Sequence, residues 1–79
     1  MTMLGTQYVR RALDHWKRWR PAMYKEMQEN GTLDAEAQRA SREAATQVAS
    51  LMESGMQRHE AEEMVLPDLI TLQPEPGIE

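Results

Sequence analysis

His59 and Glu63 are the two side chains whose types and spacing come closest to a catalytic motif. Four residues apart on a helix, they would lie on one face, which is how metalloprotease helices present two of their metal ligands. A catalytic zinc site also needs a third protein ligand and an open coordination position, and the sequence offers no third ligand near this pair. We therefore predict an exposed, charged helix face here, with no metal and no cofactor.

Other catalytic patterns are missing from the sequence. It contains no cysteine, no glycine-rich phosphate loop and no nucleophile elbow around a serine. Its 79 residues also leave little room for the concave pocket that catalysis normally requires. We predict that the protein is not an enzyme.

Positive charge and aromatic side chains are concentrated in the first third of the chain. Residues 1–31 carry six basic and three acidic side chains, whereas residues 32–79 carry three basic and ten acidic ones, and the net charge is −4. Tryptophan and arginine are enriched at the energetic hot spots of protein interfaces. We therefore predict a partner-binding surface made of Arg11, Lys17, Arg18, Trp19 and Arg20.

Two other binding functions fit the same charge pattern. Basic residues attract phosphates and aromatic rings stack on unpaired bases, so the segment 10–20 is also a candidate for binding nucleic acid. The overall negative charge makes that less favoured, because nucleic-acid modules are usually basic. A phage inhibitor that covers the nucleic-acid-binding groove of a host defence complex would instead use an acidic face. The candidate residues for that face are Glu36, Glu43, Glu53, Glu60 and Glu63.

The hydrophobic spacing predicts an all-α bundle of three to four helices that position these residues. Thr6 is a candidate N-cap for a first helix that ends near Trp19, and Pro21 begins a second helix that ends at Asn30-Gly31. The pattern leaves open whether these are two helices or one kinked helix. A long central helix over about 34–54 follows. The fourth helix covers 57–66, and Pro67 kinks or ends it.

The length predicts one small helical domain over 1–72, followed by a flexible, disordered Pro-containing tail over 73–79. A chain this short has a marginal core, and without cysteine it cannot form disulfides. A protein partner or a homo-oligomer is therefore expected to add stability. Ala61, Met64 and Val65 form the predicted buried side of the fourth helix. The predicted core consists of Tyr8, Leu13, Trp16, Met23, Met27, Leu33, Ala37, Ala40, Ala44, Val48, Leu51, Val65 and Leu69.

The sequence also predicts a soluble, cytoplasmic protein with no membrane partner. No stretch approaches the roughly 20 apolar residues that cross a bilayer. The N-terminus lacks the charged start and apolar run of a signal peptide.

Part of the chain resembles known sequences of mobile elements. The string Trp19-Arg20-Pro21, followed by Tyr24, Met27, Gly31 and Leu33, resembles the pattern RP-x-x-Y-x-x-L-x-x-x-G-x-L of the TnpV family of transposon-encoded proteins, with Met27 in place of the usual Leu. The chain also resembles small helical proteins of phages and prophages that have an HW…RP start, a G-x-L, a long helix and an L-x-PE ending. The corresponding pieces are His15-Trp16, Arg20-Pro21, Gly31-Thr32-Leu33 and Leu72-Gln73-Pro74-Glu75.

The resemblance implies a phage or mobile-element origin and a bacterial host, and it transfers no catalytic or binding residues. We therefore expect a non-enzymatic protein–protein interaction module, an assembly factor or a modulator of a host protein. The acidic inhibitor and the nucleic-acid-binding protein are the alternatives.

Overall fold

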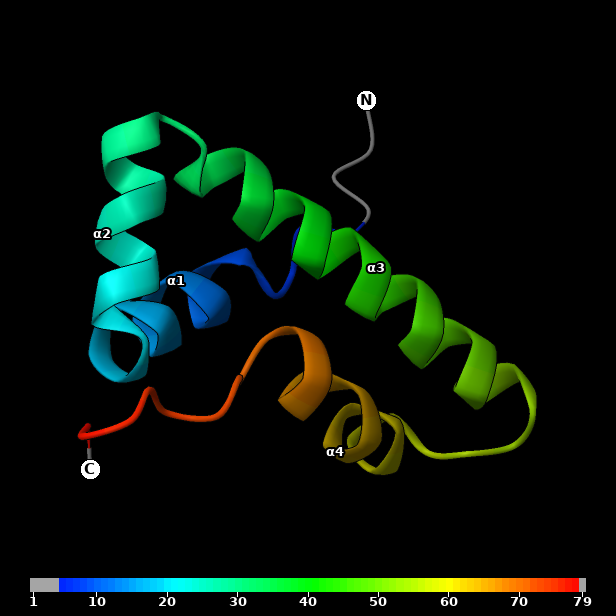
Figure 1. Cartoon of the computed structure of the whole chain (residues 1–79). Helices are drawn as coiled ribbons and strands as arrows, with labels where there is room; N and C mark the ends of the chain where they lie inside the picture. The colour runs from blue at the N-terminus through cyan, green and yellow to red at the C-terminus, as the bar shows by residue number, and fades with distance from the viewer. Residues whose placement is uncertain (1–4, 79) are drawn as a thin grey trace.

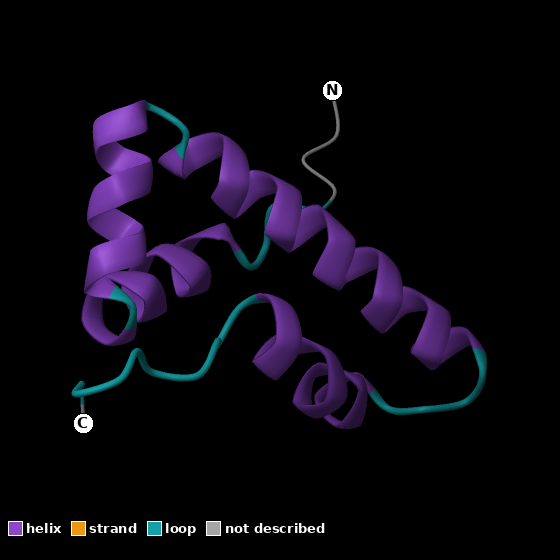
Figure 2. Cartoon of the chain, in the orientation of Figure 1, coloured by secondary structure: helices purple, strands orange, loops and turns teal. Residues whose placement is uncertain are grey.

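The computed structural model describes residues 5–78, and this part of the chain contains four α-helices and no strand (Figure 1, Figure 2). The helices are α1 (Val9–Trp19), α2 (Pro21–Asn30), α3 (Leu33–Glu53) and α4 (Arg58–Leu69). The predicted all-α bundle with a long central helix is confirmed. α1 and α2 are separate helices, which answers the question that the sequence left open.

The other helices pack against α3. It runs along one edge of the molecule, with α1 and α2 beside its first half and α4 folded back along its second half (Figure 1). Its buried stripe consists of Ala37, Ser41, Ala44 and Val48. Small side chains at the first three positions let the backbone of a neighbouring helix come close. The molecule is flat, with extents of 39, 33 and 13 Å, so its core is thin.

Two glycines and one proline set the helix boundaries. At Gly31 and Gly55 the backbone has positive φ angles of 75° and 109°, which glycine adopts without steric cost. Both form Schellman ends, in which the next residue donates its N–H five residues back, from Thr32 to Met27 and from Met56 to Leu51. The α1–α2 break lies at Arg20 (φ −130°, ψ 55°), as the following Pro21 requires.

α4 is longer than the sequence predicts and passes through Pro67. It begins with a reciprocal capping box between Gln57 and Glu60, which satisfies two free N–H groups. Pro67 removes the N–H that would bond the Glu63 carbonyl, but both residues are exposed, so water can replace that bond. The prediction that Met64 is buried is wrong, since the residue is 59% exposed. Ala61, Val65 and Leu66 cover the inner side of α4.

The core joins the inner face of α1 to α3 and α4. Tyr8, Trp16, Ala37, Ala44, Val48 and Val65 are buried, as predicted. The other predicted core residues, among them Leu13, Met23 and Leu69, are partly buried at its edge. Four buried hydrophobic residues were not in the predicted core list: Ala12, Ala61, Leu66 and Ile70.

The prediction that Thr6 is the N-cap of the first helix is wrong. The N-cap position is Tyr8, and the helix begins at Val9. The Tyr8 N–H donates to the Ser41 hydroxyl at 3.0 Å, and the same hydroxyl donates to the Gly5 carbonyl. Ser41 is fully buried and is the one buried polar residue in the described part of the chain. A side chain of α3 therefore holds the N-cap residue of α1 in place.

The tail, for which the sequence predicts disorder, contains neither helix nor strand through residue 78, but its first residues make specific contacts. The Glu75 N–H donates to the Trp19 carbonyl at 2.9 Å. The Glu75 carboxylate accepts the N–H groups of Ala22 and Met23 at 3.1 and 3.0 Å. These two N–H groups belong to the first turn of α2, which has no side-chain cap of its own. The first turn of α2 thus finds its acceptor in the segment that follows α4.

Candidate interaction surface on α1

The solvent-facing side of α1 gathers three of the five predicted partner-binding residues. Arg11, Arg18 and Trp19 lie along one helical stripe, at the spacing that places side chains on one face. They line a shallow hollow of about 550 Å³ together with four further residues. We call this surface the α1 outer face; it consists of Gln7, Arg10, Arg11, Asp14, His15, Arg18 and Trp19.

Trp19 is held at the edge of this surface by contacts on several sides. The Arg18 guanidinium carbon lies 4.8 Å from the centre of the Trp19 ring, within the range of a cation–π contact. The His15 ring is tilted against it, with 6.4 Å between the ring centres. The backbone carbonyl of Trp19 is bonded by Glu75. The ring is half-buried rather than free, so binding a partner would cost little side-chain entropy.

His15 connects the outer face to the segment after α4. Its Nε2 lies 2.7 Å from the Leu72 carbonyl oxygen. A carbonyl only accepts hydrogen bonds, so the Nε2 atom must carry the proton in this arrangement. The ring orientation next to Trp19 is therefore fixed by a contact with the other end of the chain.

The remaining two predicted residues lie elsewhere. Arg20 donates to the Gln73 carbonyl at 3.1 Å and approaches the Met23 sulfur at 3.9 Å, and its Nε is buried without a hydrogen-bond partner in the described residues. It therefore contacts the tail rather than the outer face. Lys17 is exposed but does not line the hollow. Pro21 explains the difference at Arg20, because the helix ends there and the side chain leaves the helical stripe.

Four contributors to the outer face, Gln7, Arg10, Asp14 and His15, were not among the predicted partner-binding residues. Arg10 pairs with Asp14 at 3.6 Å, and both side chains are highly exposed, so this pair adds little stability. Spacings of three or four residues from Arg11 and Arg18 would have identified Gln7, Asp14 and His15. Glu75 gives no comparable signal, because its partners lie more than fifty residues away in the sequence.

A second hollow, of about 430 Å³, lies beside α4 and includes His59 and Glu63. Nearby, the Tyr8 hydroxyl donates to Glu62 at 2.7 Å, and the Arg11 guanidinium carbon lies 6.0 Å from the Tyr8 ring centre. Burial, followed by the hydrogen bond to Glu62, raises the pKa of Tyr8 to about 12. Among residues 5–78, no three His, Cys, Asp or Glu side chains gather closely enough to hold a metal ion.

The five glutamates of the acidic alternative do not share one hollow. Glu36 and Glu43 line a groove bounded by α2 and α4, whereas Glu63 lines the hollow beside α4. Glu60 is engaged in the capping box, where it accepts the Gln57 N–H at 3.2 Å. Glu53 lies exposed at the end of α3.

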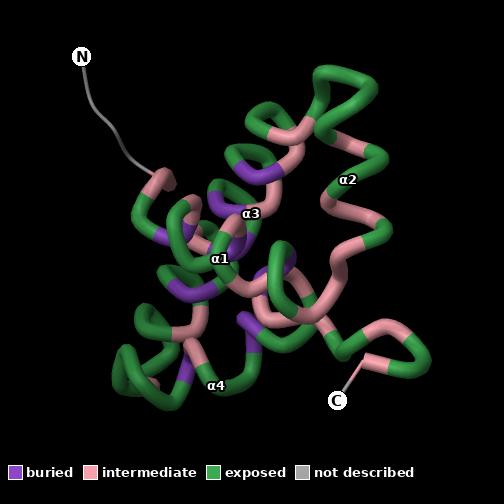
Figure 3. The backbone as a smooth tube through the Cα atoms, turned by 90° about the vertical axis from the view of Figure 1, so that its left-hand side faces the viewer, coloured by how far each residue is buried: buried purple, intermediate pink, exposed green. Residues whose placement is uncertain are grey.

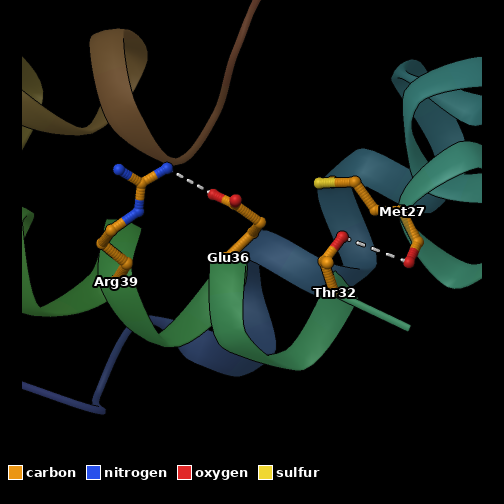
Figure 4. A network of polar contacts seen from close by, with 4 residues as sticks. All are labelled: Met27, Thr32, Glu36 and Arg39. Atoms are coloured by element: carbon orange, nitrogen blue, oxygen red, sulfur yellow. Dashed lines mark hydrogen bonds and ion pairs between the residues drawn. The ribbon is translucent and has the colours of Figure 1, made fainter. Parts of the chain in front are cut away.

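The groove with Glu36 and Glu43 has a volume of about 250 Å³. Its walls are apolar and include Met23, Met27, Leu69 and Leu72. Its rim carries Glu36, Arg39, Glu43 and Asp68. Figure 4 shows the Arg39 guanidinium directed at the Glu36 carboxylate, and beside them Thr32, whose hydroxyl donates to the Met27 carbonyl at 3.4 Å. We call this site the α2–α4 groove.

Comparisons with known proteins identify no relative of this chain. No protein-family model, no curated protein and no solved structure matches the chain. Within the described residues, no helix is both long and apolar enough to cross a membrane.

Proposed function

We propose that this chain is a non-enzymatic protein–protein interaction module, encoded by a phage or mobile element, that acts in the cytoplasm of a bacterial host. Its contact surface is the α1 outer face. The observation that carries the proposal is the half-exposed Trp19 ring with the Arg18 guanidinium stacked on it at 4.8 Å. Tryptophan and arginine are the residue types most enriched at interface hot spots. The resemblance of the stretch around Arg20-Pro21 to mobile-element sequences supports the origin.

The fold supplies the rigidity that such a contact needs. Trp19 is fixed by Arg18, His15 and the backbone of Glu75, so its position is set before a partner arrives. Preorganised side chains lose less entropy on binding. The acidic alternative lacks a comparable site, because its five glutamates are distributed over separate parts of the surface.

A capture experiment with matched variants tests the proposal. The tagged protein is incubated with bacterial host lysate, in parallel with Arg18→Ala and Trp19→Ala. Lys25→Ala, an exposed basic residue on α2, is the control. We expect one host protein to be captured in stoichiometric amount by the parent and the control and to be lost with both α1 variants. Equal capture by all four proteins would place the contact surface elsewhere.

A second function, nucleic-acid binding, is favoured by one observation. Arg10, Arg11 and Arg18 line the same surface as Trp19, which combines phosphate attraction with an aromatic ring for base stacking. Fluorescence anisotropy with a labelled single-stranded RNA would detect it. Binding that weakens steeply between low and physiological salt supports this function, and no binding at low salt excludes it.

A further inference from the structure

The α2–α4 groove is an incompletely covered part of the core. α2 contains no buried residue, and its apolar side chains Met23, Tyr24 and Met27 are only partly buried. Figure 3 shows the α2 tube without any of the buried segments that mark the other helices. Methionine side chains adapt to the shape of a docking group. One wall of the groove is thus apolar, adaptable and not closed by another helix.

The rim of the groove selects for a positively charged partner. It carries three carboxylates and one guanidinium. Arg39 is paired with Glu36, whereas Glu43 and Asp68 form no salt bridge with any residue in the described part of the chain. Both are exposed. An apolar floor of about 250 Å³ with the exposed carboxylates of Glu43 and Asp68 beside it fits one large apolar side chain flanked by cations.

The α1 outer face of the same chain carries such a group, a large apolar side chain beside cations. The α1 outer face carries three arginines and one aspartate, and one of the arginines, Arg18, lies over the partly exposed Trp19 ring. The charges of the two surfaces are therefore opposite in sign. No residue lines both sites: α1 contributes Trp16 to the groove and Trp19 to the outer face. One copy can consequently use both surfaces at the same time.

We propose that the α2–α4 groove binds the α1 outer face of a second copy of this chain, with Trp19 of one copy against Met23 and Met27 of the next and Arg18 beside Glu43 and Asp68. The inference rests on the proposed function, since it uses the same contact surface and names a second copy as the partner. Because two different surfaces meet, the contact is heterologous, and it produces a closed ring or an extending chain of copies.

Sedimentation velocity of the full chain, from low micromolar to millimolar concentration, tests the proposal with two charge reversals. Glu43→Lys blocks the groove and Arg18→Glu blocks the outer face. We expect the parent to form species larger than the monomer as its concentration rises. Each variant alone should stay monomeric. An equimolar mixture of the two should form a heterodimer, because one intact groove and one intact outer face remain. The heterodimer should dissociate as salt is raised.

The controls are Glu53→Lys and Lys25→Glu, two charge reversals at exposed positions that line neither surface. Both should associate like the parent. A parent that remains monomeric at millimolar concentration overturns the inference, and so does a mixture of the two blocked variants that stays monomeric. Circular dichroism melts of all variants verify that they are folded.

The outcome also separates this inference from the proposed function. Capture of a host protein that depends on Trp19, together with a monomeric parent, supports the interaction module and overturns self-association. Self-association that depends on Arg18 and Glu43, without any captured host protein, supports the second copy as the partner. Absence of both results removes both proposals.

Discussion

α1 contains two tryptophans in different environments, Trp16 in the core and Trp19 at the surface. Trp16 is 3% exposed, and its indole N–H donates to the Ile70 carbonyl at 2.8 Å. Trp19, three positions along the helix, keeps part of its ring at the surface under Arg18. Composition cannot distinguish these two tryptophans. Helical spacing does not distinguish them either, because three residues advance the direction of a side chain by about 300° and leave the two side chains within about 60° of each other. Trp19 is the last residue of α1 and lies at the edge of the core, whereas Trp16 lies inside it.

The largest expected effect is the loss of stability on replacing Trp16, compared with the loss on replacing Trp19. Trp16→Ala removes a large buried side chain and leaves the Ile70 carbonyl without its donor. We expect a loss of about 3–5 kcal/mol in the free energy of unfolding, enough to unfold much of so small a domain. Trp19→Ala, the matched comparison, removes a ring that is only partly buried and should cost less, about 1–2 kcal/mol. Urea titrations followed by circular dichroism measure both values, and equal losses would contradict the distinction between the faces.

Much of the helical framework could be predicted from the sequence because its signals are local. Pro21, Gly31 and Gly55 each set a helix boundary through their own backbone preference, and the structure places the boundaries there. The apolar periodicity likewise identified Trp16 as core. Pro67 misled the prediction of the fourth helix, since the helix passes through it where the backbone faces solvent.

The interaction surface was only partly predictable, because several of its determinants are contacts between distant segments. Arg11, Arg18 and Trp19 follow from helical spacing. Arg20 does not belong with them, since it bonds the backbone of residue 73. The fixed position of Trp19 depends on Glu75, and no periodicity relates these residues.

The second prediction concerns the inner face where α1 begins. The Ser41 hydroxyl accepts the Tyr8 N–H and donates to the Gly5 carbonyl, in a fully buried position. Ser41→Ala removes both bonds. It leaves the Tyr8 N–H unsatisfied in a buried position, which costs about 1–3 kcal/mol, whereas Gly5 is partly exposed, so water can replace the bond to its carbonyl. We expect a loss in that range, with the start of α1 the first region to gain amide hydrogen exchange. Ser50→Ala, an exposed serine of the same helix, is the control. Similar melts for the two variants would mean that the buried hydroxyl does not fix the start of α1.

The third prediction uses the pH dependence of Tyr8, where the inner face of α1 meets α4. The pKa of Tyr8 is raised from 10.0 to about 12, first by burial and then by the hydrogen bond to Glu62. The folded protein therefore holds this proton more tightly than the unfolded chain. The resulting stability is fully present below pH 10 and is lost as the pH rises from 10 to about 12.

Tyr8→Phe isolates this contribution, because the other titrating groups are common to both proteins. At neutral pH the variant should lose about 1 kcal/mol with the hydrogen bond. Between pH 10 and 12 the parent should lose stability more steeply than the variant. Urea titrations across this range give both slopes. Parallel curves would show that the Tyr8 hydroxyl is as free to ionise in the folded protein as in the unfolded chain.

The smallest expected effect concerns the start of α2, directly after the end of α1. α2 begins without a side-chain cap and without an acidic residue in its first turn. The Glu75 carboxylate supplies both functions, since it accepts two N–H groups there and brings negative charge to the positive end of the helix dipole. Glu75→Gln keeps an acceptor oxygen but removes the charge. We expect a loss of about 0.3–1 kcal/mol that shrinks at high salt, and Glu53→Gln, an exposed glutamate on α3, should show none. The backbone N–H of the same residue bonds the Trp19 carbonyl, so a tail that is held less tightly by its carboxylate should loosen the outer face more than the inner face. The fluorescence of Trp19, read in a Trp16→Phe background, should therefore become more accessible to a quencher. Unchanged quenching would mean that Arg18 and His15 alone hold the ring, and the tail would then have no part in forming the contact surface.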